Sequence, residues 1–214
     1  MKNILILTIL IICNPVCAFN RYLEKQEFMS LDATNGLISN EVTCIFQDSK
    51  GFIWLGTKNG LSKYDGYQCL NYKSNYLNPH FLSNNYITCI TEDKENRLWV
   101  GTKNGLNIID LPTNTTIELE DSTLKSTNIN DIVISKDSTI FIACEEEIFT
   151  YSNQTLMHIE LKRRGKDVAK SYINSLFIDS NEYLWISSWN NGYFVYDIKN
   201  HIFKDWDDVK KYAN

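Results

Sequence analysis

A repeated segment constrains what this chain of 214 residues can fold into more than any other feature. The stretch VTCIFQDSKGFIWLGTKNGLSKYDG, residues 42–66, recurs as ITCITEDKENRLWVGTKNGLNIID, residues 87–110. Each residue of the first copy meets its counterpart 45 positions later, and GTKNGL is identical in both copies. Self-similarity at such a period indicates a tandem array of one small structural unit.

Two further copies follow the first pair. Residues 171–197 read SYINSLFIDSNEYLWISSWNNGYFVYD, with aspartate and tryptophan at the spacing of the earlier copies. Between them residues 129–152, INDIVISKDSTIFIACEEEIFTYS, form a degraded copy without glycines. In this copy we align Asp137 with Asp48 and Phe141 with Trp54.

Within each unit the apolar residues alternate with period two, which favours strands over helices. In the first unit we expect strands over 42–47, 52–57, 61–64 and 67–72, separated by turn residues such as the Asn59-Gly60 pair. Four short antiparallel strands in about 45 residues make one blade of a β-propeller. The fold class is therefore all-β, with four-stranded antiparallel blades at about 28–74, 75–120, 121–162 and 163–206, inside a partial propeller that spans 19–214.

Residues at fixed positions of the repeat are expected to have structural roles. A large aromatic residue that recurs in every unit usually fills core, so the tryptophans are expected to pack between blades. The aspartates are turn residues, and the glycines serve tight backbone positions. These structural positions are Asp48, Trp54, Gly56, Gly60, Asp93, Trp99, Gly101, Gly105, Asp179 and Trp185.

The first eighteen residues have the layout of a secretory signal peptide, because Lys2 precedes a short apolar run and then small residues. A signal anchor is the alternative, although the run is too short for a membrane span. A signal peptide at residues 1–18 predicts that the mature chain is exported to the periplasm, and we expect no membrane span in that mature chain. The formal net charge is -5, which does not favour nucleic acid as a partner.

Histidine and cysteine form no catalytic or metal-binding pattern. The three histidines lie at unrelated repeat positions, so we expect no catalytic residues, no metal and no cofactor. The four cysteines of the mature part are expected to be small buried strand residues, and whether they are paired stays open. They are Cys44, Cys69, Cys89 and Cys144.

Strand order points to one edge of the blades as the binding face. The hairpin between the second and third strands of a blade lies at the same edge as the link to the next blade, here 75–86 and 162–170. Amides and an aromatic residue there could hydrogen-bond and stack a sugar, or be ordinary turn residues in solvent. The candidate ligand-binding residues are Lys58, Asn59, Lys103, Asn104, Trp189, Asn190 and Asn191. The basic run KRRGK, residues 162–166, is expected to be a solvated loop.

The repeats IFQDSKGFIWLGTKNGLSKYDG and ITEDKENRLWVGTKNGLNIID resemble the two-component regulator propeller repeat. The lead-in over 28–40 is similar to the start of the sensor region of hybrid two-component systems. The resemblance implies a periplasmic propeller of seven blades, and in full-length relatives an inner-membrane anchor, a histidine kinase, a receiver and a DNA-binding part. No kinase, receiver or DNA-binding motif is present in this sequence.

Three functions follow as hypotheses. The first is a periplasmic ligand-sensing segment, with an oligosaccharide as ligand, of a hybrid two-component sensor. The second is a stand-alone protein-binding or structural propeller module, and the third is a propeller lyase or hydrolase. Because seven blades are implied and four are present, we expect an incomplete propeller whose open faces need the remaining blades or a partner chain.

Overall fold

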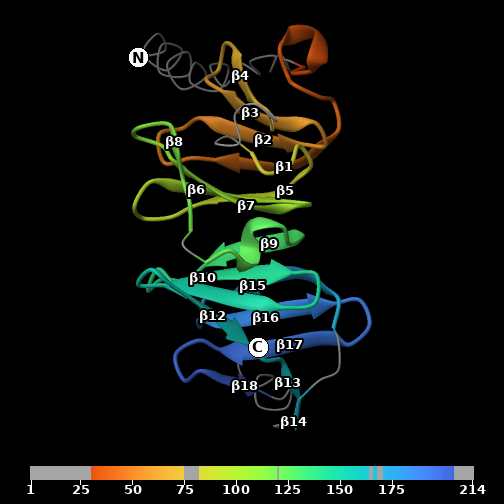
Figure 1. Cartoon of the computed structure of the whole chain (residues 1–214), viewed down its shortest axis with the longest axis vertical. Coiled ribbons are helices and arrows are strands. Elements are labelled where there is room, and N and C mark those ends of the chain that lie inside the picture. Colours follow the sequence, from red (N-terminus) through yellow and green to blue (C-terminus); the bar gives the residue numbers. More distant parts are fainter. Residues whose placement is uncertain (1–29, 75–81, 120, 164–165, 168–170, 205–214) are drawn as a thin grey trace, which may run out of the picture. The chain divides into compact units, whose positions relative to one another are not determined.

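The computed structural model describes residues 30–74, 82–119, 121–163, 166–167 and 171–204. Signal peptide 1–18 and His80 lie outside these ranges. The described part contains four four-stranded antiparallel sheets that follow one another along the chain (Figure 1). The predicted all-β propeller-blade fold is confirmed.

Each sheet is a simple meander in which every strand pairs with its neighbour in the sequence. The first sheet contains β1 (Val42–Gln47), β2 (Ile53–Thr57), β3 (Gly60–Tyr64) and β4 (Cys69–Tyr72). The second contains β5 (Ile87–Glu92), β6 (Arg97–Thr102), β7 (Gly105–Asp110) and β8 (Thr115–Ile117). The third contains β9 (Ile129–Ile134), β10 (Ile140–Cys144), β11 (Ile148–Ser152) and β12 (Thr155–Ile159). The fourth contains β15 (Ile173–Ile178), β16 (Tyr183–Ser188), β17 (Gly192–Asp197) and β18 (Ile202–Lys204).

Short elements lie before and between the sheets: η1 (Ala33–Asn35), η2 (Thr123–Lys125), β13 (Lys162–Arg163) and β14 (Lys166–Asp167). β13 and β14 pair with each other, so residues at both ends of the basic run lie in short strands where we expected a loop. In the first sheet β4 begins two residues later than expected. The reason is that Asp65 accepts the backbone N–H groups of Tyr67 and Gln68, which keeps both residues in the turn.

The core consists of three apolar clusters, each between two consecutive sheets. In these clusters Trp54 and Trp99 are fully buried, as is Phe141 in the third sheet. The first strand of each sheet contacts the first strand of the next, from β1 to β5, β9 and β15. The sheets therefore stack through their first two strands, and the second strand carries the repeated tryptophan.

The repeated aspartate and tryptophan act together. One carboxylate oxygen of Asp48 accepts the N–H groups of Lys50 and Phe52, and the other accepts the indole Nε1–H of Trp54 at 2.8 Å. The same indole-to-carboxylate hydrogen bond joins the pairs of the second and fourth sheets at 2.7 and 2.9 Å: Trp99 with Asp93, and Trp185 with Asp179. Each aspartate thus closes the turn and anchors the tryptophan.

The alignment of Asp137 with Asp48 is wrong. The Ser135 N–H donates to the Thr139 carbonyl at 3.0 Å, as the Asp48 N–H donates to that of Phe52 at 2.9 Å. Ser135 therefore occupies the aspartate position. Asp137 lies two residues later and accepts a hydrogen bond from the Ser135 hydroxyl. Phe141 does occupy the tryptophan position, six residues after Ser135.

The four cysteines of the described part are free thiols. Cys44 lies opposite Gly56 in the β1–β2 pair, and Cys89 lies opposite Gly101 in β5–β6. Burial raises the pKa of the Cys44 thiol to about 11 and that of Cys144 to about 12. These thiols are therefore neutral packing residues at physiological pH.

Candidate functional site

One edge of the sheets brings hairpins and inter-sheet links together, as the strand order predicts. A backbone N–H of the hairpin between the second and third strands donates to the carbonyl of the residue just before the first strand. The distance is 3.0 Å in each of three sheets: Lys58 to Glu41, Lys103 to Tyr86, and Trp189 to Tyr172. We call this edge the link edge.

A β-bulge interrupts the first strand of every sheet close to the link edge. Bulges re-aim a side chain, and every residue at these positions is polar. Thr43 donates to the Ile87 carbonyl at 2.7 Å, and Asn130 donates to that of Ile173 at 2.6 Å. The four bulge residues are Thr43, Thr88, Asn130 and Asn174.

A cavity of about 450 Å³ opens at the link edge between the second, third and fourth sheets. We call it the link-edge cavity. Three amides, two aromatic residues and two charged residues contribute to its lining. They are Lys103, Asn128, Asn130, Glu145, Tyr172, Asn174 and Trp189.

Trp189 presents a large aromatic surface at this cavity. Its side chain is 81% exposed, yet the indole Nε1–H donates to Asn174 Oδ1 at 3.1 Å. The Trp189 backbone is also tied to the carbonyl of Tyr172, which is itself 46% exposed. An exposed tryptophan that is fixed through its N–H is a preorganised stacking surface.

Asn128 lies in the link between the second and third sheets. The preceding residue, Thr127, accepts the Gly105 N–H at 2.8 Å, which holds the link against the second-sheet hairpin. Asn128 Oδ1 is shielded from solvent and has no hydrogen-bond partner. Among the residues that the structure describes, it is the one buried side-chain nitrogen or oxygen in that condition.

The two charged residues of the cavity are engaged differently. Lys103 Nζ lies 5.7 Å from the centroid of the Tyr86 ring, within the range of a cation–π contact. Glu145 lies in the hairpin between β10 and β11 of the third sheet, and its backbone carbonyl accepts the Ile173 N–H at 2.9 Å. None of the described basic residues forms an ion pair with the Glu145 carboxylate.

Of the candidate residues from the sequence, Lys103 and Trp189 line the link-edge cavity. Lys58 pairs with Glu41 at 2.7 Å in the first sheet. The other candidates form hydrogen bonds in and beside the hairpins. The backbone N–H groups of Asn59 and Asn104 donate to the hydroxyl groups of Thr57 and Thr102, respectively. The side chain of Asn190 accepts the backbone N–H of Tyr172, and that of Asn191 donates to Ser171 Oγ.

Six lining residues were not among the candidates: Asn128, Asn130, Glu145, Tyr172, Ile173 and Asn174. One signal in the sequence could have identified two of them. Asn130 and Asn174 replace the threonines that precede Cys44 and Cys89 in the first two units. Positions that differ between copies are where a repeat protein carries specificity.

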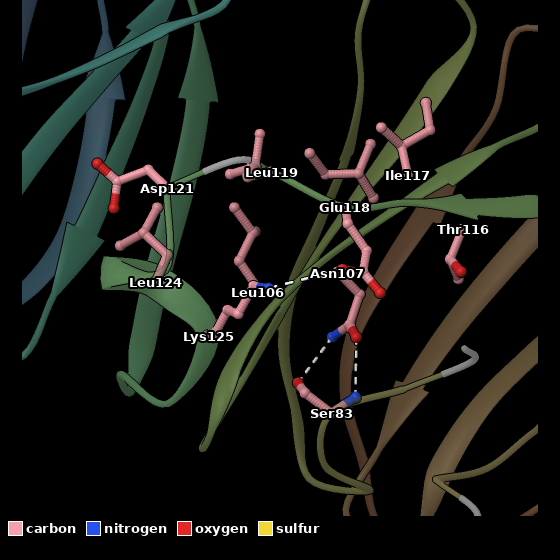
Figure 2. Close-up of a pocket in the computed structure, with 11 residues that line it drawn as sticks. Ser83, Leu106, Asn107, Thr116, Ile117, Glu118, Leu119, Asp121, Leu124 and Lys125 are labelled. Atoms are coloured by element: carbon pink, nitrogen blue, oxygen red, sulfur yellow. Dashed lines mark hydrogen bonds and ion pairs between the residues drawn. The ribbon is translucent and has the colours of Figure 1, made fainter. Parts of the chain in front are cut away.

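A second cavity, of about 270 Å³, lies beside β7 (Figure 2). Its wall is mostly apolar, with Leu106, Leu119 and Leu124, because β8 ends at Ile117 and does not cover the start of β7. Its polar pair is satisfied, since Asn107 and Ser83 exchange hydrogen bonds of 2.8 and 3.0 Å (Figure 2).

The described residues contain no group of three or more histidine, cysteine, aspartate or glutamate side chains arranged to hold a metal ion. No helix in the same part of the chain is long and apolar enough to cross a membrane.

Solved structures with similar folds include the extracellular domain of BT4673 from B. thetaiotaomicron, described as a putative one component system and also as a putative hybrid two component system. It matches with a TM-score of 0.66 and 22% identity over 86% of this chain and 28% of that chain. PorZ, a surface component of the type-IX secretion system of Porphyromonas gingivalis, has a TM-score of 0.60 and 13% identity, with 83% and 29% covered.

An inactive virginiamycin B lyase from Staphylococcus aureus, solved with quinupristin, has a TM-score of 0.60 and 15% identity over 83% of this chain and 58% of the lyase. At these identities the likenesses show the fold. The chain spans less than a third of the BT4673 and PorZ structures.

No curated protein matches the chain in sequence. The model of the two component regulator propeller family matches residues 36–59 and 82–104. These ranges include the two GTKN segments, residues 56–59 and 101–104, and the strands that precede the hairpins. Two segments of the chain therefore match the repeat of the two component regulator propeller family.

Proposed function

We propose that this chain is the periplasmic ligand-sensing propeller segment of a hybrid two-component signal-transduction sensor, and that its ligand is an oligosaccharide. The signal peptide expected at 1–18 accounts for export. The observation that carries the proposal is Trp189, an exposed indole fixed by Asn174 at a cavity with several amide side chains.

The chemistry of the link-edge cavity suits a sugar. The C–H face of a pyranose ring packs on an aromatic plane, and Trp189 and Tyr172 both expose such planes. An asparagine amide has both donors and acceptors, which match hydroxyl groups that also have both. The cavity of about 450 Å³ is within the size range of small-molecule sites.

The sensing role is supported by the two family repeats and by the fold shared with the extracellular domain of BT4673. In a sensor of this kind the propeller binds and a histidine kinase elsewhere in the protein reads the occupancy. The chain itself would then be a binding part and not an enzyme. A stand-alone protein-binding or structural module is the alternative.

Isothermal calorimetry with a panel of neutral, acidic and amine-bearing oligosaccharides tests the proposal. We expect one class to bind, and Trp189→Ala to weaken its affinity about tenfold, because a stacking contact contributes about 1 kcal/mol or more. Tyr67→Ala is the matched control, since Tyr67 is a 95% exposed aromatic residue in the β3–β4 turn of the first sheet. If no glycan binds folded protein while a protein partner does, sugar sensing is wrong.

A further inference from the structure

The contacts between consecutive sheets follow one plan, in which the two sheets contribute different residues. In the contact between the first and second sheets, the earlier sheet contributes Phe46 and Trp54. The later sheet contributes Ile87 and Ile90 of its first strand. The contact between the third and fourth sheets repeats the plan, with Val133 and Phe141 against Ile173 and Leu176. Each internal contact is therefore formed by two unlike faces.

The first sheet exposes the face that a later sheet would bury. Val42 is the counterpart of Ile87, and its side chain is 38% exposed whereas that of Ile87 is fully buried. Ile45 is the counterpart of Ile90 and of Leu176, and it is 68% exposed whereas Leu176 is buried. We call this surface, defined by Val42 and Ile45, the front face.

The fourth sheet exposes the opposite half of the plan. Phe177 is the counterpart of Phe46 and is 63% exposed. Trp185 is only partly buried, although Trp54 at the same position of the first sheet is fully buried. The ring of Tyr193, 46% exposed, lies 6.0 Å from that of Trp185 and enlarges the aromatic surface. We call the surface defined by Phe177, Trp185 and Tyr193 the back face.

The two faces also match in their polar groups. Thr43 donates to the Ile87 carbonyl of the next sheet, and Asn130 of the third sheet donates to a carbonyl of the fourth. In the fourth sheet Asn174 occupies this position, and the counterpart of the accepting Ile87 is Val42 of the front face. Asn174 Oδ1 already accepts an indole N–H, which leaves its amide N–H groups as donors.

We propose that copies of this chain associate head to tail, with the back face of one copy against the front face of another. Phe177 packs against Val42 and Ile45 of the second copy, and the Asn174 amide donates to the carbonyl of that Val42. The occupant is a second copy because the front face presents the same residue positions that cover the equivalent of the back face inside the chain. Such an interface is heterologous, since it joins two different surfaces.

Single variants test whether both faces take part. Ile45→Glu and Phe177→Glu should each weaken self-association about tenfold or more, because every head-to-tail contact would then bury an unpaired charge. Sedimentation velocity over a concentration series measures the association of the full chain. Tyr67→Glu adds the same charge at a 95% exposed aromatic residue of a turn, and it should associate like the parent chain.

A mixture of the two variants tests the direction of the contact. Ile45→Glu keeps an intact back face and Phe177→Glu keeps an intact front face, so the mixture can form one productive contact. We expect an equimolar mixture to form a dimer with one copy of each variant and no larger species, at concentrations where each variant alone is monomeric. Formation of this dimer also shows that both variants are folded.

Three outcomes would overturn the inference. A parent chain that stays monomeric would mean that a second copy does not cover these faces. Association of Ile45→Glu at the parental level would point to contacts between like faces, such as back face to back face. A mixture that stays monomeric, while melts followed by circular dichroism show both variants folded, would exclude head-to-tail contact.

Discussion

At the scale of single residues, the pairing of aspartate with tryptophan explains how the repeat can change without losing its fold. A buried indole N–H needs an acceptor, which Asp48 supplies to Trp54. The third sheet has Ser135 and Phe141 at these positions, and the phenyl ring has no polar hydrogen to satisfy. The two positions have therefore changed together, and the unit is not simply degraded.

We expect Asp48→Ser and Trp54→Phe to be coupled. Asp48→Ser alone should lower the free energy of unfolding by about 1 to 3 kcal/mol, because it leaves the buried indole N–H without its acceptor. In the double variant, which reproduces the third sheet, the loss should be smaller than the sum of the two single losses. Urea unfolding of all four proteins measures the coupling, and strictly additive losses would contradict it.

Asp131 should make stability depend on pH in an unusual direction. Burial raises the pKa of its carboxyl group, although the N–H groups of Leu176 and Ile132 donate to it. The folded chain therefore takes up this proton at a higher pH than the unfolded chain, so ionised Asp131 opposes folding above its folded-state pKa. Asp131→Asn should raise the free energy of unfolding at pH 7. The gain should fade as the pH drops to the unfolded value, and denaturation at several pH values measures it.

At the scale of secondary-structure elements, the first two strands of each sheet pair small side chains or glycine at one position. Cys44 faces Gly56 and Cys89 faces Gly101, whereas the third and fourth sheets pair Asp131 with Ala143 and Ser175 with Ser187. A side chain at Gly56 has no room, because its Cβ would lie 2.4 Å from Cys44 Sγ and 2.7 Å from Ile87 Cγ2. The glycine thus lets β2 pack against both β1 and β5.

Gly56→Ala should destabilise the protein by about 1 to 3 kcal/mol, the usual range for overpacking. Adding Cys44→Ala removes one of the two clashing atoms and should restore part of the loss, while the contact with Ile87 remains. Thermal unfolding of the single and double variants checks this. If Gly56→Ala melts like the parent chain, the close approach of the strands is not as tight as described.

At the scale of the whole described chain, stacking leaves one recurring apolar position uncovered. Phe46 in the first sheet and Val133 in the third pack into clusters shared with the next sheet. Phe177 is their counterpart in the fourth sheet, and its side chain is 63% exposed. An exposed aromatic residue at a packing position is expected to promote association.

We expect the chain to self-associate as its concentration rises, and Phe177→Ser to reduce that association with little change in unfolding free energy. Sedimentation velocity over a concentration series measures it. Tyr67→Ser is the control, since Tyr67 is more exposed but lies in a turn. A parent chain that stays monomeric at every concentration would show that this surface does not drive association.

The sequence by itself determined the four units, their strands, the hairpins and the edge at which hairpins and links meet. These features follow from hydrogen bonds and side-chain alternation inside one unit, so a short stretch of sequence encodes each of them. Only the structure showed that Asp48 and Trp54 act together and that Ser135 takes the aspartate position. Both depend on which atoms meet after the turn has closed.

Only the tertiary structure decided the composition of the link-edge cavity. Asn128, Glu145 and Trp189 come from two different sheets and from the link between sheets, and no repeat relation connects them. The bulges that aim Asn130 and Asn174 also depend on strand register. A cavity of this kind arises where consecutive sheets stack, so its lining depends on contacts between residues far apart in the sequence.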